Sequence, residues 1–339
     1  MHNNRRAPEK LTPPLDESGA VAVYFLLIFS VICGIGGIVI DYGNMVRVRA
    51  EVQRTADAAA LAGAAGLVPY TNPGAFTQTP NWANGVTKAH TMISNAANEA
   101  DNLQFATADG TVDYGWWLLT PPTGYVQALP KARPTTAAYL PEPAIKVSVS
   151  RNVNLYLAPI VGVTSPKTVS ATATAILPEA YKISKLPPIA VSWDVAYDTI
   201  KGNVVADVDE QDIKIQAQKG KAGWFNLTGG NSVPSVRFSD PLVSGTSTDG
   251  TSIYLVPGSK ASLTDLISEG ETVVVAVVDQ VDDKVWKSIQ GFAAFKIDSL
   301  GANSMTGHFV DQYFDPNVVP SAGTGAISGV SGTPKLVSP

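Results

Sequence analysis

The chain has 339 residues, enough for two modest domains, and a formal net charge of -5. This mildly acidic balance argues against a dedicated nucleic-acid surface, so no DNA or RNA partner is expected. A single cysteine, Cys33, excludes a disulfide framework within the chain and a cysteine metal site, and the three histidines are far apart in sequence without a zinc-binding spacing.

The N-terminal tail, residues 1–19, is followed by an uncharged apolar segment from Ala20 to Ile40. A helix of this length spans roughly 30 Å of hydrocarbon at about 1.5 Å per residue. The apolar run is longer than that of a cleavable signal peptide, and the nearest small-x-small site, Ala-Leu-Ala at 60–62, lies far downstream. Residues 20–40 are therefore predicted to form an uncleaved transmembrane helix.

The basic residues do not decide the orientation of this helix. Three precede it and three follow it, so the positive-inside rule gives a tie: Arg5, Arg6 and Lys10 before, and Arg47, Arg49 and Arg54 after. The chain beyond the helix is low in charge and rich in Thr, Ser, Asn, Gly and aromatic residues, as exported β-rich domains often are. We therefore expect a cytoplasmic tail and the bulk of the chain outside the cytoplasm.

Two features of the apolar segment suggest contacts. Three glycines without side chains would let another helix approach closely: Gly34, Gly36 and Gly37. However, glycine is also simply frequent in membrane helices, and no GxxxG spacing is present. Asp41 stands where the apolar run ends. It is either a polar contact to a neighbouring helix or an ordinary interfacial carboxylate in water, and its place at the edge favours the second.

An amphipathic pattern follows without any proline, so the membrane helix is predicted to continue over residues 41–66. Its alanine face, with Ala56, Ala60 and Ala64, is a second candidate contact surface. Residues 67–180 combine a predicted helix with strand patterns and indicate an α+β module: the helix at 81–100, and the strands at 112–119, 145–153 and 169–177.

Residues 181–316 contain short apolar runs separated by turns, which is typical of a small, mostly antiparallel β module. Residues 317–339 are rich in Gly, Ser, Val and Pro without a period and are predicted to be disordered. The predicted fold class is therefore α+β, with a transmembrane helix that continues into the first of two modules.

The sequence contains no recognised catalytic or cofactor-binding motif. An acidic cluster is better explained as a solvated loop than as a calcium site, because it lacks the glycine and distal glutamate of an EF-hand: Asp207, Asp209, Glu210 and Asp212. No nucleophile elbow, P-loop or Rossmann fingerprint occurs. We expect no catalytic residues, no metal and no cofactor. Five aromatic side chains are expected in the core of a β domain and not on a carbohydrate-binding surface: Trp116, Trp117, Trp193, Trp224 and Phe225.

Residues 18–65 resemble the N-terminal segment of the TadG-like proteins of the tight-adherence, or Flp pilus, assembly system. The likeness lies in the order of parts: a polar tail, a small-apolar start, a membrane helix with Asp41 at its end, and then an Ala-rich run after Gln53. Residues 145–177 are similar to that family's next block, and the weaker likeness of later blocks extends to about 315. The resemblance implies a non-catalytic protein of the bacterial inner membrane that helps to assemble or anchor an adhesive pilus.

The leading hypothesis is a single-span scaffold whose partners are other pilus-assembly membrane proteins or pilin subunits. One alternative is a membrane-tethered adhesin with an exposed row of aromatic side chains. Another is a processed minor pilin, because related pilins are cut after a glycine and carry Glu at the fifth following position. Here the glycine would be Gly19, and Tyr24 stands where that Glu is expected, which ranks this alternative last. The von Willebrand-type metal motif of some longer members is absent from the sequence.

Overall fold

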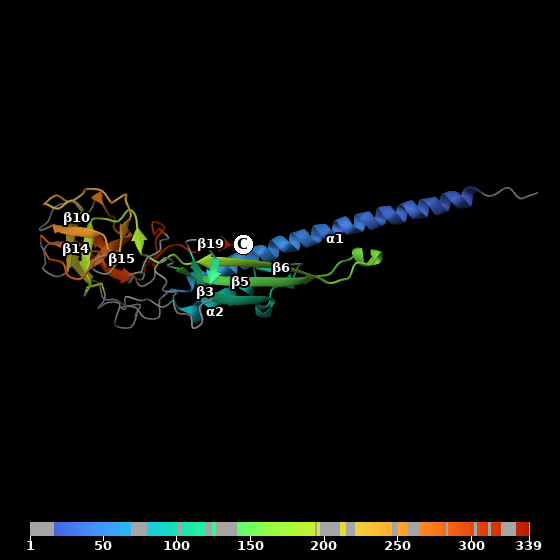
Figure 1. The fold of residues 1–339 in the computed structure, drawn as a ribbon, viewed down its shortest axis with the longest axis horizontal. Coiled ribbons are helices and arrows are strands. Elements are labelled where there is room, and N and C mark those ends of the chain that lie inside the picture. The colour runs from blue at the N-terminus through green and yellow to red at the C-terminus, as the bar shows by residue number, and fades with distance from the viewer. Residues whose placement is uncertain are drawn as a thin grey trace, which may run out of the picture. The chain divides into compact units, whose positions relative to one another are not determined.

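The predicted membrane helix continues unbroken into the rest of the fold. In the computed structural model, α1 (Glu17–Ala65) is one helix of 49 residues, drawn in blue in Figure 1. Good helix formers and the absence of proline account for its length. The structure describes residues 17–68, 80–100, 103–118, 124–126, 141–193, 195–196, 211–214, 221–245, 250–256, 265–282, 284–301, 304–310, 313–319 and 330–338.

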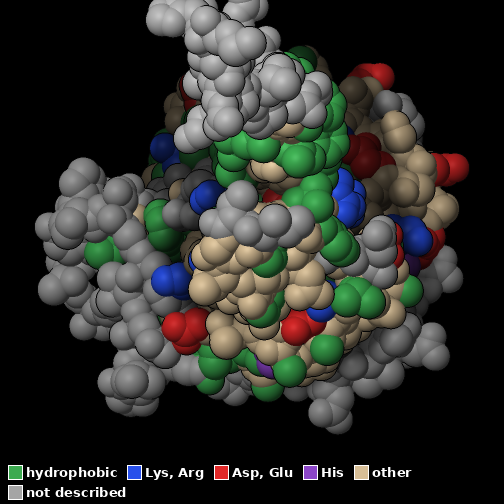
Figure 2. Space-filling view, turned by 90° about the vertical axis from the view of Figure 1, so that its right-hand side faces the viewer, with side chains coloured by type: hydrophobic (Ala, Val, Ile, Leu, Met, Phe, Trp, Pro, Cys, Tyr) green, Lys and Arg blue, Asp and Glu red, His purple; other side chains and the backbone are tan. Residues whose placement is uncertain are grey.

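The two halves of α1 have different surroundings. The bulky apolar side chains between Val21 and Ile40 are exposed, and hydrophobic side chains cover the helix on the side that faces the viewer in Figure 2. Among the described residues, α1 is the one helix long and apolar enough to cross a membrane. Farther along, small and branched residues are fully buried: Val48, Val52, Ala56, Ala59, Ala60 and Ala64.

Helix α2 (Trp82–Ile93) packs closely on the end of α1 through glycines. A Cβ built on Gly63 would lie 2.8 Å from Ile145 Cγ2 and 3.0 Å from Ala89 Cβ, and one built on Gly85 would lie 3.0 Å from the carbonyl oxygen of Gly63. The side-chain amide of Asn84 donates to the carbonyl oxygen of Gly66 at 2.6 Å. Because the last carbonyls of a helix lack partners within it, this bond caps the end of α1.

The predicted helix at 81–100 was too long. Helix α2 ends at Ile93 because polar side chains satisfy its last carbonyls: Ser94 Oγ donates to His90 O at 3.1 Å and Asn98 Nδ2 donates to Met92 O at 2.6 Å. A short hairpin of β1 (Glu99–Ala100) and β2 (Leu103–Gln104) and the 3-10 turn η1 (Thr107–Asp109) follow.

A five-stranded sheet forms the body of the α+β module, in the order β19-β6-β5-β3-β4. The strands are β3 (Gly110–Leu118), β4 (Gly124–Val126), β5 (Pro141–Val153), β6 (Lys167–Ile176) and β19 (Lys335–Ser338). Helix α2 packs on β3, where the ring of Trp82 stacks on Tyr114 and meets the edge of Trp116. On β5, Ile145 and Val147 are fully buried and Val149 is nearly so.

A second sheet of eight strands forms the β-rich module, in the order β14-β12-β10-β8-β13-β15-β16-β9. Neighbours are antiparallel, as predicted, except for the parallel pair β8 and β13. The strands are β8 (Ile189–Ser192), β9 (Gln211–Lys214), β10 (Ala222–Asn226), β12 (Ser252–Val256), β13 (Thr272–Val278), β14 (Trp286–Ser288), β15 (Gly291–Leu300) and β16 (Ser304–Val310).

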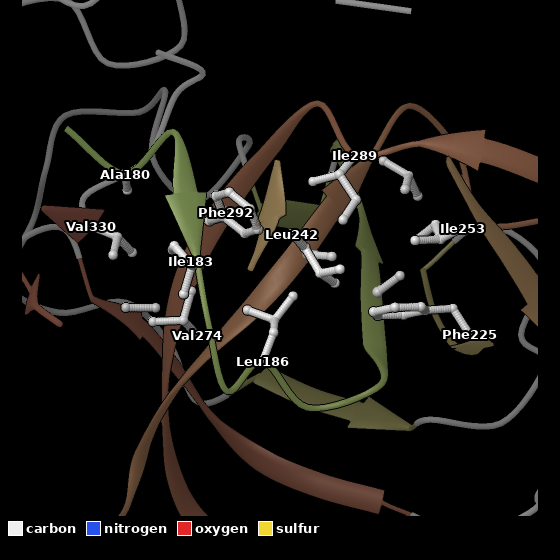
Figure 3. Packing of buried hydrophobic residues seen from close by; sticks show 14 of the residues in the cluster. Ala180, Ile183, Leu186, Phe225, Leu242, Ile253, Val274, Ile289, Phe292 and Val330 are labelled. Carbon is white, nitrogen blue, oxygen red and sulfur yellow. The ribbon is translucent and has the colours of Figure 1, made fainter. Parts of the chain in front are cut away.

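Both faces of this sheet are covered. Successive side chains of β13 point to opposite faces, so Val273 and Val275 join one apolar cluster while Val274 and Ala276 join another. Figure 3 shows the second cluster, in which Ile183, Leu186 and Leu242 pack on the sheet. Short pairs of strands supply part of this cover: β7 (Lys182–Ile183) with β11 (Leu242–Val243), and β17 (Tyr313–Phe314) with β18 (Val330–Ser331).

The end of the chain is not the disordered tail that its composition indicated. Val330 and Ser331 form β18, and β19 pairs with β6 in the five-stranded sheet. The pairing supplies backbone hydrogen bonds and the burial of Val330, which composition does not report. Residues 320–329 of the predicted tail lie outside the described part of the chain.

The packing of α1 on α2 gives a first prediction. Gly63→Leu should lower the free energy of unfolding by about 1–3 kcal/mol, the usual cost of overpacking. Gly43→Leu is the matched control, because a Cβ on Gly43 of the same helix meets nothing within 4 Å. Both variants gain the same helix propensity from the replacement of glycine by leucine. The difference between their unfolding free energies, measured with denaturant in detergent, therefore reports the effect of packing alone. Equal stability of the two variants would contradict the close approach.

Candidate interface between helix α1 and the β5–β6 loop

The loop between β5 and β6 contains a short helical turn. It is η2 (Ala158–Val161), with Pro159 in its first turn, where a missing N–H costs nothing. Gly162 ends the turn with φ +86°, a backbone conformation that favours glycine. The N–H groups of Gly162 and Val163 donate to the carbonyl oxygens of Pro159 and Ala158, both at 3.1 Å. The segment Ala-Pro-Ile-Val-Gly thus contains both a residue suited to the start of the turn and a residue suited to its end.

The first N–H groups of this turn are satisfied by a residue of α1. Asp41 Oδ1 accepts from the N–H of Tyr156 at 3.0 Å, and Asp41 Oδ2 accepts from those of Leu157 at 2.8 Å and Ala158 at 2.6 Å. Asp41 is only 2% exposed. A carboxylate from a distant helix therefore caps η2, in the role that a local Asp or Ser usually has.

Electrostatics favours the ionised form of this carboxyl. The N-terminus of a helical turn carries partial positive charge, which attracts an anion. The hydrogen bond from Ala158 N–H is the largest cause that lowers the pKa of Asp41 below its ordinary value of 3.8, and the bonds from Tyr156 and Leu157 act in the same direction against the effect of desolvation. Asp41 is thus a buried anion with three donors.

The same loop covers Gly37. A Cβ built on Gly37 would lie 2.6 Å from Leu157 Cβ, so the loop reaches its position because residue 37 has no side chain. Gly36, by contrast, has nothing within 4 Å of such an atom, and Gly34 is half-buried. Of the three predicted glycines, Gly37 is occupied by the chain's own loop and Gly36 is open.

The remaining predicted interface residues lie inside the fold. Ala56, Ala60 and Ala64 have no exposed area in the folded chain. Contacts of these alanines or of the glycines with another protein stay a prediction. The interpretation of Asp41 as an ordinary carboxylate in water was wrong, because its three donors stand 115 to 117 residues later in the sequence, beyond any local pattern.

No pattern in the sequence predicted residues 156–158 as contact residues. The Pro near the start and the Gly at the end of Ala-Pro-Ile-Val-Gly were available as signals of a helical turn, although they could not indicate what caps it. Trp116, Trp224 and Phe225 are buried, which confirms their prediction as core, while Trp117 and Trp193 are half-buried.

The predicted acidic cluster is only partly visible. Asp212 lies in β9, and Asp207, Asp209 and Glu210 fall outside the described residues. Within the described part of the chain, no three His, Cys, Asp or Glu side chains lie together in a group that could hold a metal ion.

The capping contact predicts the effect of Asp41→Asn. An amide has one acceptor oxygen where the carboxylate has two, so at least one of the three N–H groups loses its partner. Backbone hydrogen exchange at residues 156–158 should become roughly tenfold faster, as expected when a hydrogen bond to a charged acceptor is lost. Asp57→Asn is the control, because Asp57 accepts a hydrogen bond from Gln53 of its own helix, at 2.7 Å. Unchanged exchange in Asp41→Asn would contradict the cap.

The same contact should depend on pH. Because the pKa of Asp41 is lowered in the folded state, its contribution is fully present above about 3.8 and is lost as the pH falls through the still lower folded value. Exchange protection at residues 156–158, corrected for the intrinsic rate, should therefore fall in this acid range in the native chain. The Asp41→Asn chain should lack this step; an identical acid step in both chains would assign it to another group.

Two family models match the N-terminal half of the chain. One, described as Flp pilus-assembly TadE/G-like, matches residues 19–66, and the other, described as Tad-like Flp pilus-assembly, matches residues 74–175. No curated protein and no solved structure matches significantly. The matched ranges contain α1, α2 and nearly all of β3 to β6, together with both sides of the Asp41 contact. Residues 19–66 and 74–175 therefore match Flp pilus-assembly families, and the chain resembles a TadG-like protein of that system.

Proposed function

We propose that this chain is a non-enzymatic scaffold of Flp pilus assembly, anchored in the bacterial inner membrane by residues 20–40. The observation that carries the proposal is the contrast within α1: its first half exposes bulky apolar side chains, and its second half is buried in a folded module. Exposed apolar surface of this extent is stable in lipid and costly in water. One continuous helix would thus hold the module at the membrane.

The proposed orientation places the modules on the extracytoplasmic side. Its support is the low charge and β-rich character of the chain beyond α1, since the basic residues on the two sides of the helix balance. Alkaline phosphatase fused to the C-terminus should be active, because the enzyme folds only outside the cytoplasm. An inactive fusion on a stably made protein would reverse the orientation.

The membrane half of α1 also offers a docking face for other pilus-system helices. Small residues allow helix backbones to approach closely in lipid. Gly36 serves this purpose best, because it is exposed and no atom of its own chain would meet a side chain there. Phe29 stands seven residues earlier, about two turns away on the same face. The proposed docking face therefore runs through Phe29 and Gly36.

Photo-crosslinking in living cells tests this face. A photoreactive phenylalanine at Phe29 should form adducts with pilins or pilus-platform proteins. The same group at Tyr24, which is more exposed than Phe29 but lies about 120° around the helix from Gly36, should form fewer. Gly36→Leu should then reduce the adducts at Phe29 and lower piliation, whereas Gly43→Leu should change neither.

Other outcomes would favour the alternatives. Only self-adducts, or none, would favour a tethered adhesin. The chain has six tryptophans, all within the described residues, and of these only Trp286 is exposed, at 48%. The tryptophans therefore form no exposed row that would support an adhesin. An intact mass lacking residues 1–19 would identify a processed minor pilin. Equal piliation with Gly36→Leu and Gly43→Leu would contradict the docking face.

A further inference from the structure

The tip of the β5–β6 loop exposes apolar side chains, in part or for the most part. Tyr156 is 68% exposed, Leu157 37% and Val163 38%. Residues 154–164 contain no charged side chain. Contiguous exposed apolar groups of this kind mark interaction sites with proteins or membranes.

We propose that this tip, residues 155–163, lies in the headgroup region of the membrane that α1 spans and forms a second lipid contact. The inference rests on the proposed function in one respect, because it requires residues 20–40 to be the membrane anchor. It adds a second, non-helical membrane contact to that anchor.

The contacts of the tip set its depth. Asp41, the first residue after the apolar segment, holds Tyr156, Leu157 and Ala158. Leu157 also covers Gly37, which lies inside the apolar segment. Four residues of helix are about 6 Å, and the headgroup region is roughly 5–8 Å thick on each side of the hydrocarbon. The tip therefore stands at the inner edge of the headgroup region, where it meets the hydrocarbon.

Backbone N–H groups of the tip are hydrogen-bonded within the protein, as a position in the membrane requires. Non-helical backbone is tolerated at membrane depth only where its polar groups are satisfied within the protein. The N–H groups of residues 156–158 bond to Asp41, that of Leu155 bonds to Ser165 Oγ at 3.0 Å, and those of Gly162 and Val163 bond to carbonyls of the loop. Pro159 has no N–H. These six N–H groups of the tip thus have partners within the protein.

The side chains also fit lipid better than another protein helix. Tyrosine prefers the membrane interface, where its ring is apolar and its hydroxyl reaches water. Basic residues flank the tip in sequence, with Arg151 before it and Lys167 after it, and exposed Arg47 and Arg49 follow Asp41 on α1. Lysine and arginine beside an apolar surface favour anionic headgroups. The tip continues the apolar surface of the membrane segment, so lipid is the occupant that we assign.

Spin labels on the full chain, reconstituted in vesicles of phosphatidylethanolamine and phosphatidylglycerol, test the assignment. The labelled variants are Tyr156→Cys and, as a second tip position, Val163→Cys, each with Cys33→Ser. Leu103→Cys is the matched control, because Leu103 is an equally exposed apolar residue on β2. The tip labels should collide more with oxygen and less with a water-soluble nickel chelate than the label at position 103. Adding Asp41→Asn should return the tip labels toward the aqueous value.

A label on the native Cys33, which is exposed on α1, separates the two proposals. If Cys33 reports hydrocarbon while both tip labels report water, the tip contact is wrong and the anchor stands. If Cys33 also reports water, the anchor itself fails. Tip labels that are immobilised and inaccessible to both reagents would mean that protein, not lipid, covers the tip, which also overturns the assignment.

Discussion

The bond between the Asp41 carboxylate and three backbone N–H groups is the constraint on which the membrane-proximal part of this protein depends. It joins a helix residue to a loop more than a hundred residues later and satisfies N–H groups at the start of the turn that would otherwise lack an acceptor. The carboxylate is suited to this role because it offers two acceptor oxygens and a full negative charge to the positive end of η2. Gly37 completes the contact by leaving room for Leu157.

The two halves of α1 suit different surroundings, which explains why an apolar helix runs directly into an alanine-rich one. Its first half carries bulky side chains such as Leu27 and Phe29, which suit a hydrocarbon environment. Its second half carries small residues, because α2 and β5 approach its backbone closely at Gly63. No proline occurs in the helix, so no residue within it lacks a backbone N–H for the hydrogen bond to the preceding turn.

The family assignment and the structure describe the same region at different levels. The matched residues 19–66 and 74–175 coincide with α1, α2 and nearly all of strands β3 to β6, and within them the structure adds a specific contact, the cap at Asp41. The β-rich module lies beyond the matched ranges. Its central strand β13 is apolar along its length because both faces are buried, so its sequence reads as core rather than as a binding surface.

Local patterns in the sequence determined the continuous helix, predicted over residues 20–66, and the mostly antiparallel character of the second module. These follow from side-chain periodicity and from helix propensity, which act over a few residues. Only the tertiary structure decided the role of Asp41, the covering of Gly37, the burial of Ala56, Ala60 and Ala64, and the pairing of β19 with β6. Each of these depends on a partner far away in the chain, and sequence spacing carries no record of which distant groups the fold brings together.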